Sequence, residues 1–179
     1  SGTTQEIMAL RAHPERASAA DVARLEALYD AGILQLDAQI GRLLRGLRER
    51  GDLEETLVVV TSDHGEEFAD HGNFSHGHTH HRELLHVPLI LSAPGEPRGL
   101  RVPTPVSLID VVPTALALLG QAVPEDMDGI DLSPLWRGGA PPERPLFAEA
   151  GPHPREDALR SIRSGRFVLI RGPEGAQPV

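Results

Sequence analysis

Residues 57–88 read LVVVTSDHGEEFADHGNFSHGHTHHRELLHVP, and this stretch decides the fold. It opens with Leu57 and three valines, a short unbroken run of mostly β-branched residues that predicts a strand buried on both faces. The run is followed by Asp63 and His64, so a carboxylate and an imidazole are expected at the carboxyl end of that strand. Ligands bind at this position in open α/β sheets. Gly65 follows directly and permits a sharp turn.

The segment after Gly65 is unusually rich in histidine. Seven of the nine histidines of the chain lie between His64 and His86, interspersed with Glu66, Glu67 and Asp70. Imidazole nitrogens and carboxylate oxygens together favour a divalent-metal or anion site. One cation cannot use seven histidines, so most of them need another interpretation. We expect three to be structural or exposed: His80, His81 and His86. His71 and His76 are open between support of the site and a solvated loop.

Composition excludes several classes of protein. With 179 residues, 40% apolar and 24% charged, the chain is an ordinary globular one, long enough to bury a core. A net charge of -9 argues against a nucleic-acid partner, because phosphate binding needs clustered Lys and Arg. The absence of cysteine excludes disulfides, thiolate metal sites and a cysteine nucleophile within these residues. No apolar stretch is long enough to span a bilayer, so no transmembrane segment is expected in this chain.

Periodicity on either side of residues 57–88 predicts two helices. Residues 18–50 carry apolar side chains at steps of three and four, begin with a capping-box pattern at Ser18 and Asp21, and stop at Gly51. We interpret this segment as a packed surface helix, although a coiled coil would show a similar stripe. Asp110 is expected to cap a second helix that ends at Leu119.

The remaining apolar runs predict strands. These are residues 87–91, a short strand at 146–149, and a β-hairpin formed by 159–163 and 166–170 around Ser164 and Gly165. The sequence therefore predicts an α/β fold with a mostly parallel central sheet flanked by helices and a small C-terminal β-hairpin subdomain.

Several separated motifs, in this order along the chain, carry a resemblance to a known family. They are Tyr29-Asp30-Ala31-Gly32, Asp37-Ala38-Gln39-Ile40-Gly41, Thr61-Ser62-Asp63-His64-Gly65-Glu66, Gly77-His78, His86-Val87-Pro88-Leu89-Ile90, Asp110-Val111-Val112-Pro113-Thr114 and Gly129-Ile130-Asp131-Leu132-Ser133-Pro134-Leu135. Together they resemble the C-terminal half of the catalytic domain of the sulfatase family, in the alkaline phosphatase superfamily. The resemblance implies an alkaline-phosphatase-like fold, with residues 1–142 in the α/β catalytic domain and 143–179 at the start of a small C-terminal β subdomain.

The resemblance also implies roles for three residues. In the family, the Asp of the SD[NH]G motif ligates one divalent cation, commonly calcium or manganese, and this role falls on Asp63. The next residue is a second ligand or contacts the substrate oxyanion, which gives His64. A sulfate-binding Lys lies ten residues before the family's strand-entry Pro. Counting back from Pro88 gives His78, whose charge, unlike that of Lys, depends on pH near neutrality.

Two departures from the family pattern bear on function. The family's formylglycine nucleophile arises from a C/S-x-P-x-R motif that this sequence lacks, so we expect the nucleophile outside this chain. The chain is accordingly expected to be a fragment without the N-terminal half and to be inactive alone. His81 and Arg82 also replace the aromatic and acidic residues of the Leu-Tyr-Asp-Glu version of this loop.

The resulting prediction is a metal-dependent sulfuric ester hydrolase that acts on a small-molecule or carbohydrate sulfate ester. A phosphodiesterase or phosphonate monoester hydrolase of the same superfamily is the enzymatic alternative. A non-catalytic, histidine-rich metal-binding module is the third possibility.

Overall fold

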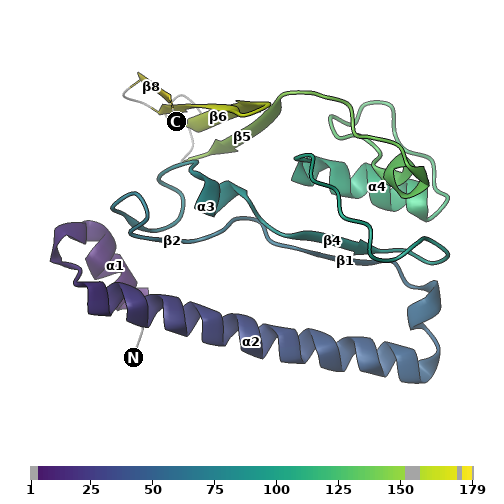
Figure 1. The fold of residues 1–179 in the computed structure, drawn as a ribbon, viewed down its shortest axis with the longest axis horizontal. Helices are drawn as coiled ribbons and strands as arrows, with labels where there is room; N and C mark the ends of the chain where they lie inside the picture. Colours follow the sequence, from purple (N-terminus) through teal and green to yellow (C-terminus); the bar gives the residue numbers. More distant parts are fainter. Residues whose placement is uncertain (1–3, 152–157, 173–174, 179) are drawn as a thin grey trace. The chain divides into compact units, whose positions relative to one another are not determined.

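The computed structural model describes residues 4–151, 158–172 and 175–178, and the chain divides into two compact units (Figure 1). One unit combines Ser1–Glu54 with His64–Val87, and the other combines Glu55–Asp63 with Pro88–Val179. We refer to His64–Val87 as the histidine-rich loop. It interrupts the second unit in sequence and belongs to the first.

The long helix of the first unit is α2, Ala19–Arg50. It begins at Ser18, whose Oγ accepts the Asp21 N–H at 3.2 Å while Asp21 Oδ2 accepts the Ser18 N–H at 2.9 Å. The hydrogen bonds from the Ser18 side chain and backbone hold the pKa of Asp21 below its ordinary value. The helix ends at Gly51 in the left-handed region, with φ of 82° and its N–H on the Arg48 carbonyl. Both predicted helix ends are confirmed.

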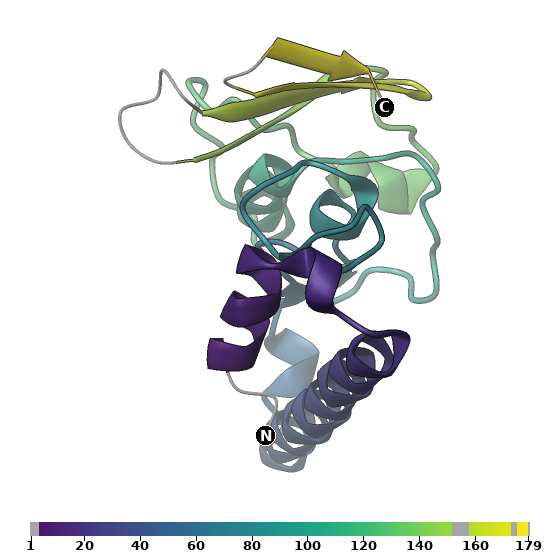
Figure 2. The same cartoon turned by 90° about the vertical axis from the view of Figure 1, so that its left-hand side faces the viewer.

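Two short elements precede α2 and were not predicted from the sequence. They are helix α1, Thr4–Ala12, and the 3-10 turn η1, Pro14–Arg16. An ion pair joins α1 to α2, with Arg24 Nη2 at 2.6 Å from Glu6 Oε2. Figure 2 shows α1 in purple, separate from the long α2 rod.

The histidine-rich loop forms a small hairpin and one helical turn. Strand β2, Glu67–Phe68, pairs antiparallel with β3, Phe74–Ser75, and α3 spans Arg82–Leu85. The Phe74 side chain is buried, and the Phe68 ring meets the Tyr29 ring of α2 edge-on at 5.3 Å. These contacts, with Leu25 buried, support the packed-helix interpretation for this part of α2.

In the second unit, β1, Val58–Thr61, pairs with β4, Leu89–Ser92, after the short turn η2, Leu53–Glu55. The pairing is antiparallel, as are all strand pairs among the described residues, where the sequence predicted mostly parallel strands. A parallel partner requires a crossover, usually a helix packed on the sheet, but residues 62–88 form only a hairpin and the four-residue α3. The β1 valines are also half-buried rather than covered on both faces.

The helix predicted after Asp110 is α4, Val111–Leu118, and the turn η3, Leu108–Asp110, leads into it. The predicted capping role of the Asp110 side chain is wrong, because this side chain is fully buried and makes no capping bond to α4. It accepts the Ile130 N–H at 2.9 Å and pairs with Arg144. Asp110 therefore joins three distant segments of the second unit.

The C-terminal sheet has the antiparallel order β5-β6-β7-β8 (Figure 2). Its strands are β5, Leu146–Ala150; β6, Leu159–Ser164; β7, Phe167–Gly172; and β8, Gly175–Pro178. The predicted 146–149 strand and hairpin are confirmed, whereas β8 was not predicted. The turn η4, Ser133–Arg137, lies before this sheet in sequence. The domain boundary after residue 142 stays a prediction. Among the described residues, no helix is both long and apolar enough to cross a membrane.

Candidate active-site loop

The predicted metal ligands lie where β1 ends. Asp63 is exposed, and His64 follows as a half-buried residue whose Nδ1 lies 2.8 Å from the Gly65 carbonyl oxygen. A carbonyl only accepts, so Nδ1 carries the proton and the neutral ring has its lone pair on Nε2. The His64 ring also packs on the His76 ring, with centroids 4.0 Å apart. His64 is thus held in the tautomer whose Nε2 lone pair can bind a cation.

Gly65 is required by close packing on α3. A Cβ atom at this position would lie 1.9 Å from the Glu83 carbonyl oxygen, far inside van der Waals contact. The Gly65 N–H donates to the Leu84 carbonyl at 2.8 Å, and the Leu84 side chain is buried. The turn that carries His64 is therefore fixed against the backbone of α3.

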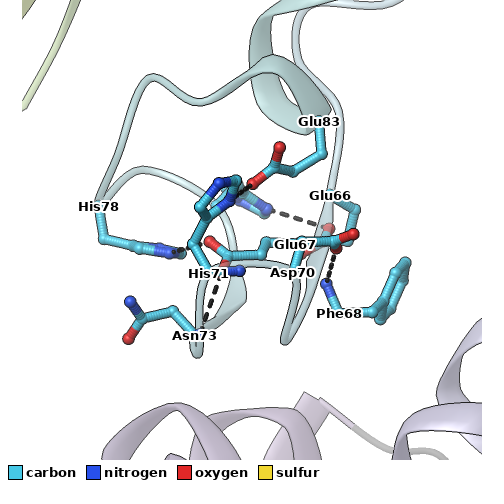
Figure 3. A network of polar contacts seen from close by, with 9 residues as sticks. Glu66, Glu67, Phe68, Asp70, His71, Asn73, His78 and Glu83 are labelled. Atoms are coloured by element: carbon cyan, nitrogen blue, oxygen red, sulfur yellow. Dashed lines mark hydrogen bonds and ion pairs between the residues drawn. The ribbon is translucent and has the colours of Figure 1, made fainter. Parts of the chain in front are cut away.

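Glu67 is the buried centre of the loop (Figure 3). Its side chain has no exposed surface, and its Oε1 accepts the backbone N–H of His71 at 2.9 Å and of Asn73 at 3.0 Å. Its Oε2 lies 2.8 Å from His78 Nε2. Burial by itself raises the pKa of Glu67, but the hydrogen bonds from His78, Asn73 and His71 outweigh it and hold the pKa below its ordinary value. Glu67 is accordingly ionised at neutral pH.

Two further histidines pair with carboxylates at the periphery of the loop. His71 Nδ1 lies 2.6 Å from Glu83 Oε1, and His76 Nδ1 lies 3.2 Å from Glu66 Oε2. These pairs account for His71 and His76 as parts of a hydrogen-bonded network rather than as freely solvated residues. The contacts distribute the two histidines over different carboxylates instead of gathering them around one point.

Of the three histidines expected to be structural or exposed, His80 is buried, His81 is half-buried and His86 is exposed. His80 is 4% exposed, and its burial lowers its pKa, so it is neutral at neutral pH. His81 stacks on His71 with centroids 3.7 Å apart and an interplanar angle of 12°. His86 is exposed, with Arg82 Nη2 at 3.3 Å from its Nδ1.

One group in the loop has the donor set of a cation site. In the part of the chain that the structure describes, ligand atoms of Glu67, His71 and Glu83 all lie within 4.8 Å of one another. All three side chains already take part in hydrogen bonds with one another or with the loop backbone. The assignment of Asp63 and His64 as metal ligands rests on the family resemblance and stays a prediction.

Sequence reasoning named both histidines expected to act on the ester but missed the carboxylate that holds one of them. His64 is placed beside His76, and His78 is placed beside Glu67. Glu67 was noted only as one of several carboxylates in the segment. Its neighbour Glu66 has the same chemistry, and no apolar alternation in the two-residue strand β2 indicates which of the two faces inward.

A comparison with models of protein families tests the resemblance to the sulfatase family. The model described as Sulfatase matches residues 4–121, well over half of the chain. The chain belongs to the sulfatase family. The match includes α2, the histidine-rich loop and α4, and it ends before the C-terminal sheet.

Individual relatives agree with this membership. Mouse (Mus musculus) arylsulfatase K is 33% identical over 164 residues, which are 87% of this chain and 30% of the relative. Among solved structures, the phosphonate monoester hydrolase SpPMH from Silicibacter pomeroyi superposes with a TM-score of 0.77 at 32% identity, covering 88% of this chain and 34% of that one. A protein in complex with its substrate, D-glucosamine-2-N,6-O-disulfate, superposes with a TM-score of 0.60 at 25% identity, covering 95% and 43%.

These superpositions confirm the predicted sulfatase and alkaline-phosphatase-like fold class. The chain spans well under half of the length of the relatives it matches, from 21% of bovine (Bos taurus) arylsulfatase K to 30% of the mouse protein.

Proposed function

We propose that the complete protein is a metal-dependent sulfatase that hydrolyses a sulfate ester and that the histidine-rich loop forms one side of its active site. The observation that carries this proposal is the turn Asp63-His64-Gly65 in a chain of the sulfatase family. The turn places a carboxylate oxygen and an imidazole nitrogen at consecutive positions, and the packing of Gly65 on α3 fixes the backbone that presents His64.

The donor set of this turn fits a divalent cation. Asp63 would contribute oxygen, and His64 would contribute Nε2, because its Nδ1 proton is engaged by the Gly65 carbonyl. A bound cation would neutralise the charge of the ester and align the nucleophile. The carboxylate of Asp63 suits either calcium or manganese, but calcium takes oxygen ligands, so with calcium His64 would contact the ester oxygen instead of the cation.

His78 is the proposed contact to the ester itself. An imidazolium donates a hydrogen bond to a nonbridging oxygen or to the leaving-group oxygen, and so stabilises negative charge that develops in the transition state. The nucleophile is proposed to come from residues outside these 179, because the sequence contains no C/S-x-P-x-R motif.

A carbohydrate sulfate ester is the proposed substrate class. The support is the similarity to the solved protein whose substrate is D-glucosamine-2-N,6-O-disulfate.

The test is hydrolysis of para-nitrophenyl sulfate by the complete protein, with added calcium or manganese. His64→Ala should lower kcat/KM by at least about 10²-fold, because it removes a cation ligand or an oxyanion contact. His13→Ala is the control, since His13 lies outside the loop with 51% of its side chain exposed. Equal activity of wild type and His64→Ala would contradict the proposal.

The superposition with SpPMH favours one second candidate, phosphonate monoester hydrolysis. The two reactions can share a cation site, and the tetrahedral groups differ in charge and substitution. Comparing kcat/KM for para-nitrophenyl sulfate and para-nitrophenyl phenylphosphonate distinguishes them. A preference for the phosphonate by more than about tenfold, equivalent to about 1.4 kcal/mol, would replace the first candidate with the second.

A further inference from the structure

We propose that Glu67 is a positioning residue for His78: Glu67 Oε2 accepts the Nε2–H of the imidazole, so that when the ring takes up a second proton this proton sits on Nδ1 and is donated to an oxygen of the ester. The proposal rests on the proposed function for the identity of the ligand, a tetrahedral oxyanion. It goes further in naming which carboxylate controls the ring and which ring atom faces the ligand.

The Glu67 carboxylate is held in one orientation by its hydrogen bonds. Two backbone N–H groups, those of His71 and Asn73, both donate to Oε1, so this oxygen is fixed within the β2–β3 turn. The remaining oxygen, Oε2, meets His78 Nε2 at 2.8 Å (Figure 3). The side chain is fully buried, so its rotamer is held by packing as well.

The hydrogen bond to Glu67 determines which nitrogen of the neutral His78 ring carries the proton. An ionised carboxylate can only accept hydrogen bonds, so Nε2 must carry a proton whether the ring is neutral or charged. The nearby carboxylates Glu66 and Glu83 pair with His76 and His71, so they do not take the place of Glu67. Glu67 therefore selects a single tautomer of the neutral His78 ring.

The other ring nitrogen of His78, Nδ1, is placed to contact a ligand. Nδ1 is buried, and it has no hydrogen-bond partner among the described residues. The side chain as a whole is 19% exposed, so part of the ring reaches the surface of the loop. Once it is protonated, Nδ1 is a buried donor without a partner, which is unfavourable, and a ligand oxygen would accept its hydrogen bond. An atom of this kind is what an anion contact requires.

Glu67→Gln separates positioning from packing, because Gln has the same shape as Glu. The two backbone N–H groups need an acceptor, so they retain the amide oxygen of the substituted side chain and direct its NH₂ group at His78 Nε2. An NH₂ group only donates, so Nε2 must then hold a lone pair and the proton must move to Nδ1. The substitution should reverse the tautomer of His78 with little change in the loop.

The experiment uses the complete protein labelled with ¹⁵N-histidine. Long-range ¹H–¹⁵N spectra report which ring nitrogen carries the proton, and the His78 signals are identified by their loss in His78→Gln. Wild type should show protonated Nε2, and Glu67→Gln should show protonated Nδ1. Inorganic sulfate should bring a proton onto Nδ1 in wild type while Nε2 keeps its own, whereas Nε2 should stay unprotonated in Glu67→Gln. The control is Glu83→Gln, which alters the partner of His71 and should leave His78 unchanged.

Activity gives an independent measurement. Glu67→Gln should lower kcat/KM for para-nitrophenyl sulfate by about 10²-fold, as loss of a supporting hydrogen bond does at other sites, whereas Glu149→Gln, at a surface ion pair with Arg160, should change it less than about threefold. In a His78→Lys background, Glu67→Gln should have a much smaller effect, because an ammonium group has no tautomers. A purely structural role for Glu67 would instead give the same loss in both backgrounds.

Several results would overturn the proposal: a neutral wild-type His78 ring with its proton on Nδ1, no proton uptake at Nδ1 on addition of sulfate, or unchanged activity in Glu67→Gln. The spectra of wild type and its sulfate titration decide it even where Glu67→Gln does not fold. A protein that hydrolyses neither ester but shows the predicted tautomer and sulfate response would refute the proposed function and leave the positioning role supported.

Discussion

The substitution Gly65→Ala tests whether the histidine-bearing turn is fixed against α3. An Ala Cβ would lie 1.9 Å from the Glu83 carbonyl oxygen, whereas ordinary contact begins at 3.4 Å, so the two backbones must separate by about 1.5 Å. The obstacle is backbone rather than the end of a flexible side chain. The separation would break the hydrogen bond from the Gly65 N–H to the Leu84 carbonyl and disturb the buried Leu84 side chain.

The expected loss of stability follows from these two effects. Overpacking of this kind destabilises by about 1–3 kcal/mol, and a lost backbone hydrogen bond adds about 1 kcal/mol. Urea denaturation of the complete protein should therefore show a decrease of roughly 2–4 kcal/mol in the free energy of unfolding. Gly46→Ala is the matched control, because Gly46 lies inside α2 and a Cβ added there would have no atom within 4 Å. It should be neutral or stabilise by up to about 1 kcal/mol. Equal stability of Gly65→Ala and wild type would refute the close-packing argument.

Three further predictions address the metal, the buried carboxylates and pH. Asp63→Ala should weaken binding of calcium or manganese by the complete protein in titration calorimetry, while His13→Ala should not; equal affinities would place the cation elsewhere. Glu67 has a lowered folded pKa, so its contribution to stability is present above its ordinary pKa of 4.5 and is lost as pH falls through the folded value. Acid denaturation of Glu67→Gln should consequently be less steep than that of wild type, and identical pH dependences would contradict the hydrogen-bond assignment. Asp110→Ala should destabilise by about 3 kcal/mol in urea, because it leaves the partly buried Arg144 guanidinium and backbone donors unpaired. Glu149→Ala, which removes a surface ion pair, should change stability by less than about 1 kcal/mol; a similar effect of both substitutions would be inconsistent with the buried role of Asp110.

Local signals in the sequence predicted the helices and the hairpin well. The ends of α2 are set by Ser18 and Gly51, and each acts through atoms within four residues of itself. The turn between β6 and β7 consists of Gly165 and Arg166, one residue later than predicted, with Gly165 at φ of 55°. Interactions of this range can be derived from residue types alone.

Non-local features could not be predicted in the same way. The apolar run of β1 has the composition of a buried strand in either direction, so it does not encode antiparallel pairing with β4. The partner of His78 is 11 residues away, and Glu67 rather than the adjacent Glu66 is its partner because Glu67 is the residue that packs inward at the start of β2. The buried position of Asp110 depends on Arg144, 34 residues further along. Each of these depends on tertiary packing that periodicity does not contain.

The insertion of the histidine-rich loop between β1 and β4 has a consequence for how the family can diversify. Thr61 and Leu89 are partners in the β1–β4 register, so the two strands close the chain around residues 62–88. The entropy of closing a flexible loop grows only with the logarithm of its length, and doubling the length costs about 0.6 kcal/mol. Residues can therefore be added to or removed from this segment with little penalty to the strand pairing, provided that Glu67 and Gly65 keep their partners. A segment with this freedom can change the side chains it offers to a substrate while the pair of strands that supports it stays the same.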